Sequence, residues 1–103
     1  MSQSNEVALL VGAGDAIGAA VARRFAIGGY KVCIARRDAA KSAALIEELR
    51  AEGFAVHAFD VDARQEVEVE KLFAHVEDTV GPIAVCLFKT LADFEVAKRH
   101  EKT

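Results

Sequence analysis

The sequence VGAGDAIGAAVARRF, residues 11–25, passes from a short apolar run into a segment with helical spacing, and glycines lie at the junction. The run Val7–Val11 is apolar throughout, which is typical of a strand covered on both faces. Apolar residues then recur every four positions and predict an amphipathic helix over residues 16–27. A loop that leads from a strand into a helix N-terminus can direct several backbone N–H groups at an anion. The junction therefore predicts an anion-binding site.

The alternation of short apolar runs and helical segments continues to residue 88. Further strands are predicted over residues 30–35, 54–59 and 83–88, and further helices over residues 39–52 and 62–80. The last of these helices is expected to begin at a capping box formed by Asp62 and Gln65. Right-handed helical crossovers of this length join strands into a parallel sheet with helices on both faces. We therefore expect an α/β doubly wound parallel sheet with the strand order 3-2-1-4, half of a Rossmann-type fold.

The residues that follow have a different pattern. Thr90 and Asp93 have the spacing of a helix cap, and the apolar residues after them would share one side of a helix. We expect a short C-terminal helix here. The chain then divides into a binding unit over residues 1–88 and a divergent tail over residues 89–103.

The composition is that of one globular domain: 103 residues, of which 52% are hydrophobic and 28% charged. No apolar run approaches the roughly 18 residues that a membrane span needs. The net charge of -3, with acidic and basic residues interspersed, excludes a broad nucleic-acid-binding surface. Because the N-terminal residues lack the features of a secretory signal, we expect a cytoplasmic protein in which Cys33 and Cys86 are reduced and buried.

Gly12, Gly14 and Gly18 give the loop the spacing Gly-x-Gly-x-x-x-Gly. Glycine is needed where such a turn is tight, where the backbone contacts a pyrophosphate, and where helix and strand pack closely. The loop that binds nucleoside triphosphates has a different spacing and a lysine, which is absent here. The sequence thus favours a dinucleotide, and a glycine-rich turn that serves tight packing alone is the alternative.

Two arginines follow the second predicted strand. At this position an acidic residue would bind a ribose 2′-hydroxyl, whereas an arginine would bind a 2′-phosphate. Arg36 and Arg37 therefore indicate NADP as the cofactor rather than NAD. Asp38 could bind a 2′-hydroxyl, but its place before a helix favours an N-cap. The alternative for the arginines is a pair of solvated surface charges.

The third predicted strand ends at Asp60-Val61. The carboxyl ends of parallel strands line the ligand crevice in such sheets. We expect Asp60 to accept a hydrogen bond from the adenine amino group and Val61 to lie against the adenine ring. The alternative for Asp60 is a helix-capping role.

The glycine loop resembles that of the short-chain dehydrogenase/reductase family. In that family the first and last glycines are six residues apart, as Gly12 and Gly18 are, and the motif ends in Ile-Gly, as Ile17-Gly18 does. Ala16 stands where the family has its middle glycine. The resemblance implies that Ala16 and Ile17 border the cofactor together with the glycines.

The resemblance extends over residues 6–88. The family has Asp-Val after its third strand, as Asp60-Val61 here, and its NADP-preferring members have arginines after the second strand, as Arg36 and Arg37 here. It implies a protein that binds the adenosine and pyrophosphate of NADP(H).

The resemblance ends after the fourth predicted strand. The family continues there with Asn-Asn-Ala-Gly, whereas residues 88–91 are Phe-Lys-Thr-Leu. The family also requires a catalytic serine and a Tyr-x-x-x-Lys pair, and neither can be placed. The single tyrosine, Tyr30, is followed directly by Lys31 and opens a strand. The resemblance therefore implies a truncated reductase without oxidoreductase activity of its own, and it names no substrate.

Two other classes of function are alternatives for a small parallel sheet of this kind. A non-catalytic nucleotide-sensing or interaction module would act through a partner, and the apolar residues 83–88, as an exposed sheet edge, would promote self-association or pairing with a full-length relative. A phosphoacceptor receiver domain would need several acidic residues after the first strand to hold magnesium, and only Asp15 is present. The three histidines have no metal-ligand spacing.

Overall fold

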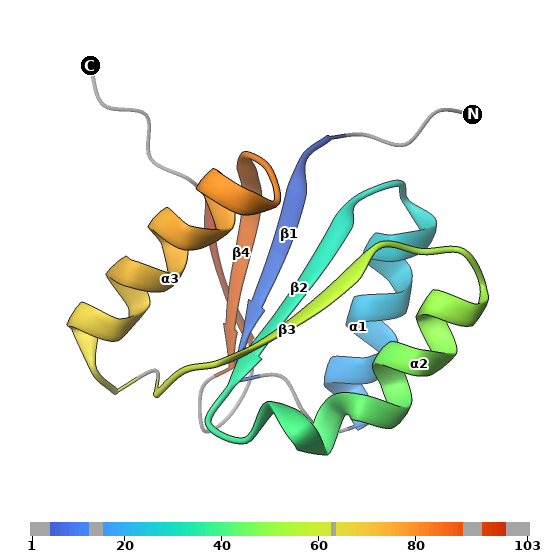
Figure 1. The fold of residues 1–103 in the computed structure, drawn as a ribbon, viewed down its shortest axis with the longest axis horizontal. Helices are drawn as coiled ribbons and strands as arrows, with labels where there is room; N and C mark the ends of the chain where they lie inside the picture. Colours follow the sequence, from blue (N-terminus) through green and yellow to red (C-terminus); the bar gives the residue numbers. More distant parts are fainter. Residues whose placement is uncertain (1–4, 13–15, 63, 90–93, 99–103) are drawn as a thin grey trace.

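The computed structural model describes residues 5–12, 16–62, 64–89 and 94–98. Its sheet has the strand order β3-β2-β1-β4-β5 (Figure 1). The strands are β1 (Val7–Val11), β2 (Lys31–Arg36), β3 (Val56–Asp60), β4 (Ile83–Lys89) and β5 (Phe94–Lys98). The helices are α1 (Ala16–Ile27), α2 (Ala43–Ala51) and α3 (Glu66–Thr79), with a 3-10 turn at Ala39–Ser42 before α2. The first four strands are parallel, which confirms the predicted order 3-2-1-4.

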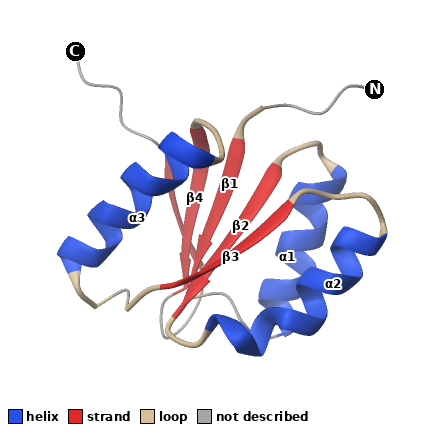
Figure 2. Cartoon of the chain, viewed as in Figure 1, coloured by secondary structure: helices blue, strands red, loops and turns tan. Residues whose placement is uncertain are grey.

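The central strand β1 is buried because helices cover both faces of the sheet: α1 and α2 lie on one face and α3 on the other (Figures 1 and 2). Successive side chains of a strand point to opposite faces. Accordingly, Leu9 belongs to the hydrophobic cluster that includes Val76 of α3, and Leu10 to the one that includes Leu49 of α2. A strand between two such layers needs apolar residues at every position, which is the pattern of Val7–Val11.

Glycines follow the ends of the first two helices. Gly29 and Gly53 have φ angles of 97° and 94°, in the left-handed region that favours glycine. The predicted capping box before α3 is wrong. Gln65 is the N-cap of α3 and makes no side-chain capping bond, while the Asp62 carboxylate accepts hydrogen bonds from Arg64 instead.

The predicted C-terminal helix is also wrong. Residues 94–98 form β5, which pairs antiparallel with β4 from Lys89↔Phe94 to Val85↔Lys98. A β4 strand without this neighbour would leave a row of unpaired backbone N–H and C=O groups, and pairing with β5 satisfies them. The expectation that residues 83–88 form an exposed edge is therefore wrong as well, because β4 lies between β1 and β5.

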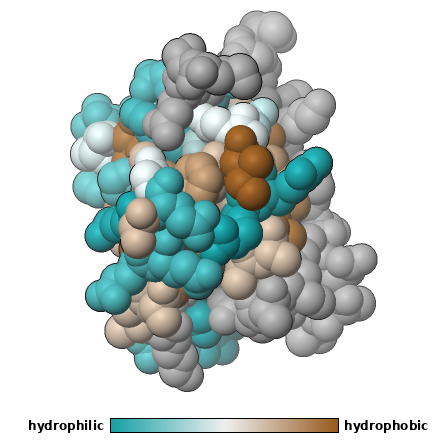
Figure 3. Space-filling view, turned by 90° about the vertical axis from the view of Figure 1, so that its right-hand side faces the viewer, coloured by the Kyte–Doolittle hydropathy of each residue, from teal (hydrophilic) through white to brown (hydrophobic). Residues whose placement is uncertain are grey.

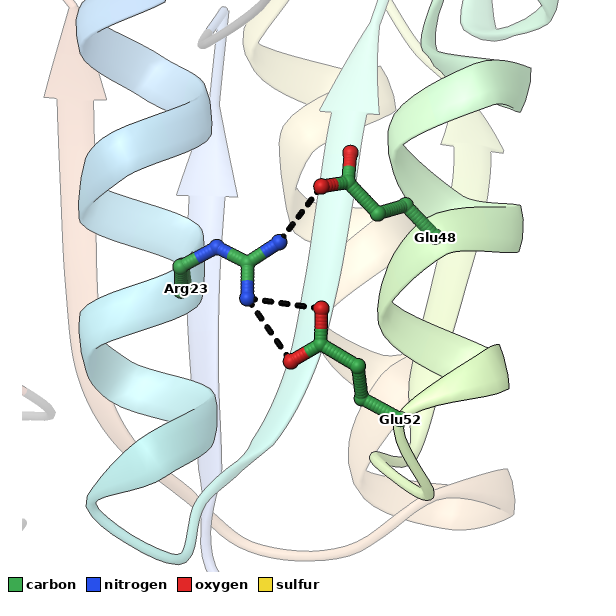
Figure 4. Close-up of polar contacts among 3 residues, drawn as sticks. All are labelled: Arg23, Glu48 and Glu52. Carbon is green, nitrogen blue, oxygen red and sulfur yellow. Dashed lines mark hydrogen bonds and ion pairs between the residues drawn. The ribbon is translucent and has the colours of Figure 1, made fainter.

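Arg23 connects the outer faces of α1 and α2 (Figure 4). Its Nη1 donates to both carboxylate oxygens of Glu52, at 2.7 and 2.8 Å, and its Nη2 donates to Glu48 at 2.7 Å. Figure 3 shows this side of the molecule as mostly hydrophilic, with a small strongly hydrophobic area. No helix among the described residues is both long and apolar enough to cross a bilayer.

Candidate functional site

A hollow of about 580 Å³ lies at the carboxyl ends of three adjacent strands, β1, β2 and β3. Its lining residues are Gly12, Arg36, Arg37, Asp38, Val61, Asp62 and Arg64. Each of them either ends one of these strands or follows it closely. The hollow is thus built by the parallel register of the sheet, and its charged wall carries three arginines and two aspartates.

Gly12 lines the hollow where β1 ends. Its φ angle of 82° lies in the left-handed region, and its N–H donates to the carbonyl oxygen of Ala35 at 2.7 Å. A residue with a Cβ is strained in this conformation. The backbone conformation at the first position of the loop therefore requires glycine. This bond also ties the start of the loop to β2.

The rest of the predicted loop is described only in part. Gly14 lies outside the described residues. Ala16 and Ile17 open α1, and Gly18 is buried in its first turn. Because α1 begins at the edge where β1 ends (Figure 1), the N-terminal end of its dipole lies on the same side of the sheet as the hollow.

The two predicted arginines lie together in the lining of the hollow. Arg36 is the last residue of β2, and its Nη1 contacts Oγ of the buried Ser42 at 3.4 Å. Arg37 follows it and is exposed. Asp38 occupies the N-cap position of the 3-10 turn, as expected, but makes no side-chain capping bond there. Asp38 also lines the hollow, together with the two arginines.

The structure separates the two residues predicted to contact adenine. Val61 is only 4% exposed and lines the hollow. Asp60, the register partner of Arg36, lies outside that lining and borders a neighbouring hollow of about 290 Å³ together with Glu68, Lys71 and others. Val61 lines both hollows, so the two are adjacent.

Asp62 and Arg64 line the hollow but were not predicted as site residues. Nε and Nη2 of Arg64 each lie 3.1 Å from an oxygen of the Asp62 carboxylate, and the Arg64 N–H donates to it at 3.0 Å. These hydrogen bonds lower the pKa of Asp62, and the charge of Arg37 lowers it further. Both residues lie in the loop between β3 and α3. Their position after a strand end was a partial signal, but Asp62 was interpreted as a helix cap.

The cysteines have the structural role predicted for them. Cys33 and Cys86 are buried in the strands on either side of β1, both opposite Leu9. Burial raises the pKa of each thiol to about 12, which keeps it protonated at neutral pH. The described residues contain no group of three or more histidine, cysteine, aspartate or glutamate side chains that could hold a metal ion.

Comparison with known proteins gives a consistent result. The family model for short chain dehydrogenase matches residues 6–88. The 2,3-dihydro-2,3-dihydroxybenzoate dehydrogenase of Bacillus subtilis is 31% identical over 80 residues, which are 78% of this chain and 31% of that protein.

Two solved structures share the fold. An actinorhodin polyketide ketoreductase with NADPH matches with a TM-score of 0.75 and 32% identity, over 84% of this chain and 34% of that one. A metagenomic short-chain oxidoreductase in complex with NADP matches with a TM-score of 0.76 and 29% identity, over 84% of this chain and 39% of that one. The chain thus spans about a third of the length of these relatives.

Proposed function

We propose that this chain, which belongs to the short-chain dehydrogenase family, binds the adenosine and pyrophosphate part of NADP(H) in the hollow at the ends of β1, β2 and β3. One observation carries the proposal: Gly12, Arg36, Arg37 and Val61 all line the same hollow. It is further supported by the two structural relatives, whose structures contain NADPH and NADP.

The pyrophosphate would lie between the end of β1 and the start of α1. Gly12 follows β1 in a left-handed conformation, and the N-terminal N–H groups and dipole of α1 favour an anion. By resemblance to the family, Gly14, Ala16, Ile17 and Gly18 complete this loop. A short residue at each of these positions, apart from Ile17, allows the backbone to approach the phosphates closely.

The 2′-phosphate of NADP would bind Arg36 and Arg37. A phosphate monoester carries between one and two negative charges at neutral pH and pairs well with planar guanidinium groups. Ser42 contacts the Arg36 side chain and so restricts its rotamers. Arginines outnumber aspartates in the lining, so the hollow favours the phosphorylated cofactor over NAD, which has a neutral hydroxyl at this position.

The adenine ring would lie against Val61. From there its amino group could reach Asp60, because Val61 lines both the main hollow and the smaller one that Asp60 borders. An acceptor in that place suits the amino group of adenine.

We further propose that these 103 residues do not transfer hydride on their own. The single tyrosine, Tyr30, lies before β2, at the opposite end of that strand from Arg36, and its ring packs edge-on against Phe25 with centroids 5.5 Å apart. No other phenol is present to exchange a proton with a substrate. Binding without turnover is also what a nucleotide-sensing module acting through a partner would show.

Thermal unfolding of the chain with no ligand, with NADPH and with NADH tests the binding proposal. A ligand that binds only the folded state stabilises it by RT ln(1 + [L]/Kd), about 2.7 kcal/mol at a hundredfold excess over Kd. We expect both ligands to raise the midpoint and NADPH to raise it more. An unchanged midpoint with both would contradict the proposal, and steady oxidation of NADPH by a carbonyl compound would contradict the absence of hydride transfer.

A further inference from the structure

We infer that Arg64 is a third cation of the 2′-phosphate subsite and selects the phosphorylated cofactor, with Asp62 as the residue that positions it. This inference rests on the proposed function and extends it to a pair of residues after β3. Arg64 lines the same hollow as Arg36 and Arg37, although it comes from a different strand end. The subsite then has positive charge on two walls rather than on one.

The Asp62 carboxylate holds the guanidinium of Arg64 in a defined orientation. Nε and Nη2 of Arg64 face the two carboxylate oxygens at 3.1 Å, a side-by-side geometry that one rotating contact would not maintain. The backbone N–H of Arg64 donates to the same carboxylate at 3.0 Å. The backbone N–H of Asp62 donates to Glu68 of α3, also at 3.0 Å, so the loop is fixed to the helix that follows it.

This arrangement leaves part of the guanidinium for a ligand. Arginine has five N–H donors, and Asp62 engages the one on Nε and one of the two on Nη2. Within the described part of the chain Nη1 has no hydrogen-bond partner, and the Arg64 side chain is 71% exposed. A pre-oriented guanidinium with spare donors loses little side-chain entropy when it binds a phosphate.

Asp62 also brings the two strand ends into electrostatic contact. Its pKa is lowered first by the hydrogen bonds from Arg64 and, to a smaller extent, by the charge of Arg37. The guanidinium of Arg37, from the end of β2, is thus close enough to act on the carboxylate that holds Arg64. A phosphate in the hollow would face cations from both sides, and Asp62 offsets their mutual repulsion while the site is empty of ligand.

The test compares two ligands that differ only in the 2′-phosphate: 2′,5′-ADP, which carries it, and 5′-AMP, which does not. The variants are R64A and the matched control R24A, which removes an exposed arginine on α1 that does not line the hollow. We expect R64A to raise the Kd for 2′,5′-ADP about five- to tenfold, because one charge-assisted contact is lost. The Kd for 5′-AMP should change less than about twofold, because this ligand lacks the 2′-phosphate. R24A should change neither.

A second variant separates charge from geometry. R64K keeps the positive charge but lacks the planar fork that Asp62 holds, so we expect a Kd for 2′,5′-ADP between those of the wild type and R64A. Unfolding midpoints without ligand show whether each variant is folded. R64K also serves as the test if R64A is unstable.

The inference is overturned if R64A weakens both ligands equally or neither, since Arg64 is then only a surface partner of Asp62. The proposed function fails in a different way. In that case the wild-type chain binds neither 2′,5′-ADP nor NADPH. If R36A and R37A lose 2′,5′-ADP selectively while R64A does not, the cofactor site stands and the role of Arg64 does not.

Discussion

Val61 donates its backbone N–H to the carbonyl oxygen of Arg36 at 2.9 Å. This bond continues the parallel pairing of β2 and β3 one step beyond the last register pair, Arg36↔Asp60. It fixes the distance between the arginines at the end of β2 and the residues that follow β3. The candidate site therefore depends on the register of two strands as well as on the glycine loop.

The left-handed backbone of Gly12 can be tested with a matched pair of variants. Gly12 and Gly53 have similar φ angles, 82° and 94°, but only Gly12 lines the hollow. An added Cβ at Gly53 would meet no atom within 4 Å, so its cost is backbone strain alone. We expect G12A and G53A each to lower the stability by about 1–2 kcal/mol. Only G12A should also weaken NADPH binding, and normal binding by folded G12A would contradict the account.

The cofactor preference can be tested at the end of β2. The double variant R36A/R37A removes two cations from the lining of the hollow. We expect it to raise the Kd for NADPH at least about tenfold and the Kd for NADH no more than about threefold, because charged hydrogen bonds to a phosphate are lost only with NADPH. Fluorescence titration of the nicotinamide measures both. An equal rise in the Kd values for NADPH and NADH would show that these arginines do not bind the 2′-phosphate.

The contact between α1 and α2 should depend on salt. Arg23 binds Glu48 and Glu52 at the surface, and the hydrogen bond with Glu52 raises the pKa of the Arg23 guanidinium. We expect R23A to lower the unfolding midpoint at low ionic strength, and the difference from the wild type to shrink at about 0.5 M salt because of screening. The variant R24A, on the same helix, is the control. A difference that is independent of salt would indicate lost packing rather than lost charge.

Pairing of β5 with β4 can be tested by two neighbouring prolines. Along an antiparallel strand successive N–H groups point to opposite sides, so only one of Val96 and Ala97 donates to β4. Proline removes the N–H, and we expect one of V96P and A97P to lower the midpoint by about 4–8 °C, the effect of roughly 1 kcal/mol in a small domain, and the other to have less effect. If neither changes the midpoint, the pairing does not contribute to stability.

His57 in β3 should cause a loss of stability in mild acid. Burial lowers the pKa of its imidazole, and the charges of Arg50 and Lys31 lower it further. As the pH falls below about 6.5, the unfolded chain takes up the proton before the folded chain does. Stability therefore declines from near pH 7 through the folded pKa and then levels off. The unfolding midpoint of H57Q, measured as a function of pH, should lack this part of the decline. Parallel curves for H57Q and the wild type would show that His57 does not cause the loss of stability.

The sequence was sufficient to predict the four parallel strands, because each strand is an apolar run and a segment with helical spacing separates it from the next. It was misleading for the tail. Phe94 and Ala97 have helical spacing, but Phe94, Glu95 and Val96 also alternate as in a strand. Local pattern could not decide between the two. The deciding factor was the row of backbone groups on β4, a tertiary effect that only the assembled sheet reveals.

The candidate site was predicted in the same uneven way. Gly12, Arg36 and Val61 were expected and line one hollow, because the carboxyl ends of adjacent parallel strands must meet. Arg64 was missed because a residue in a loop after a strand end has no fixed direction until the loop is anchored. Here Asp62 provides the anchor, through side-chain geometry that a sequence pattern does not specify.

The most direct measurement is the amide spectrum of the isotope-labelled chain during titration with NADPH. The account predicts progressive shifts at Gly12, Arg37 and Val61, at the carboxyl ends of the strands. Gly28 and Gly53, which end α1 and α2 at the opposite edge of the sheet, should remain unchanged. An unaltered spectrum at saturating NADPH, or shifts confined to that opposite edge, would contradict the proposed cofactor site.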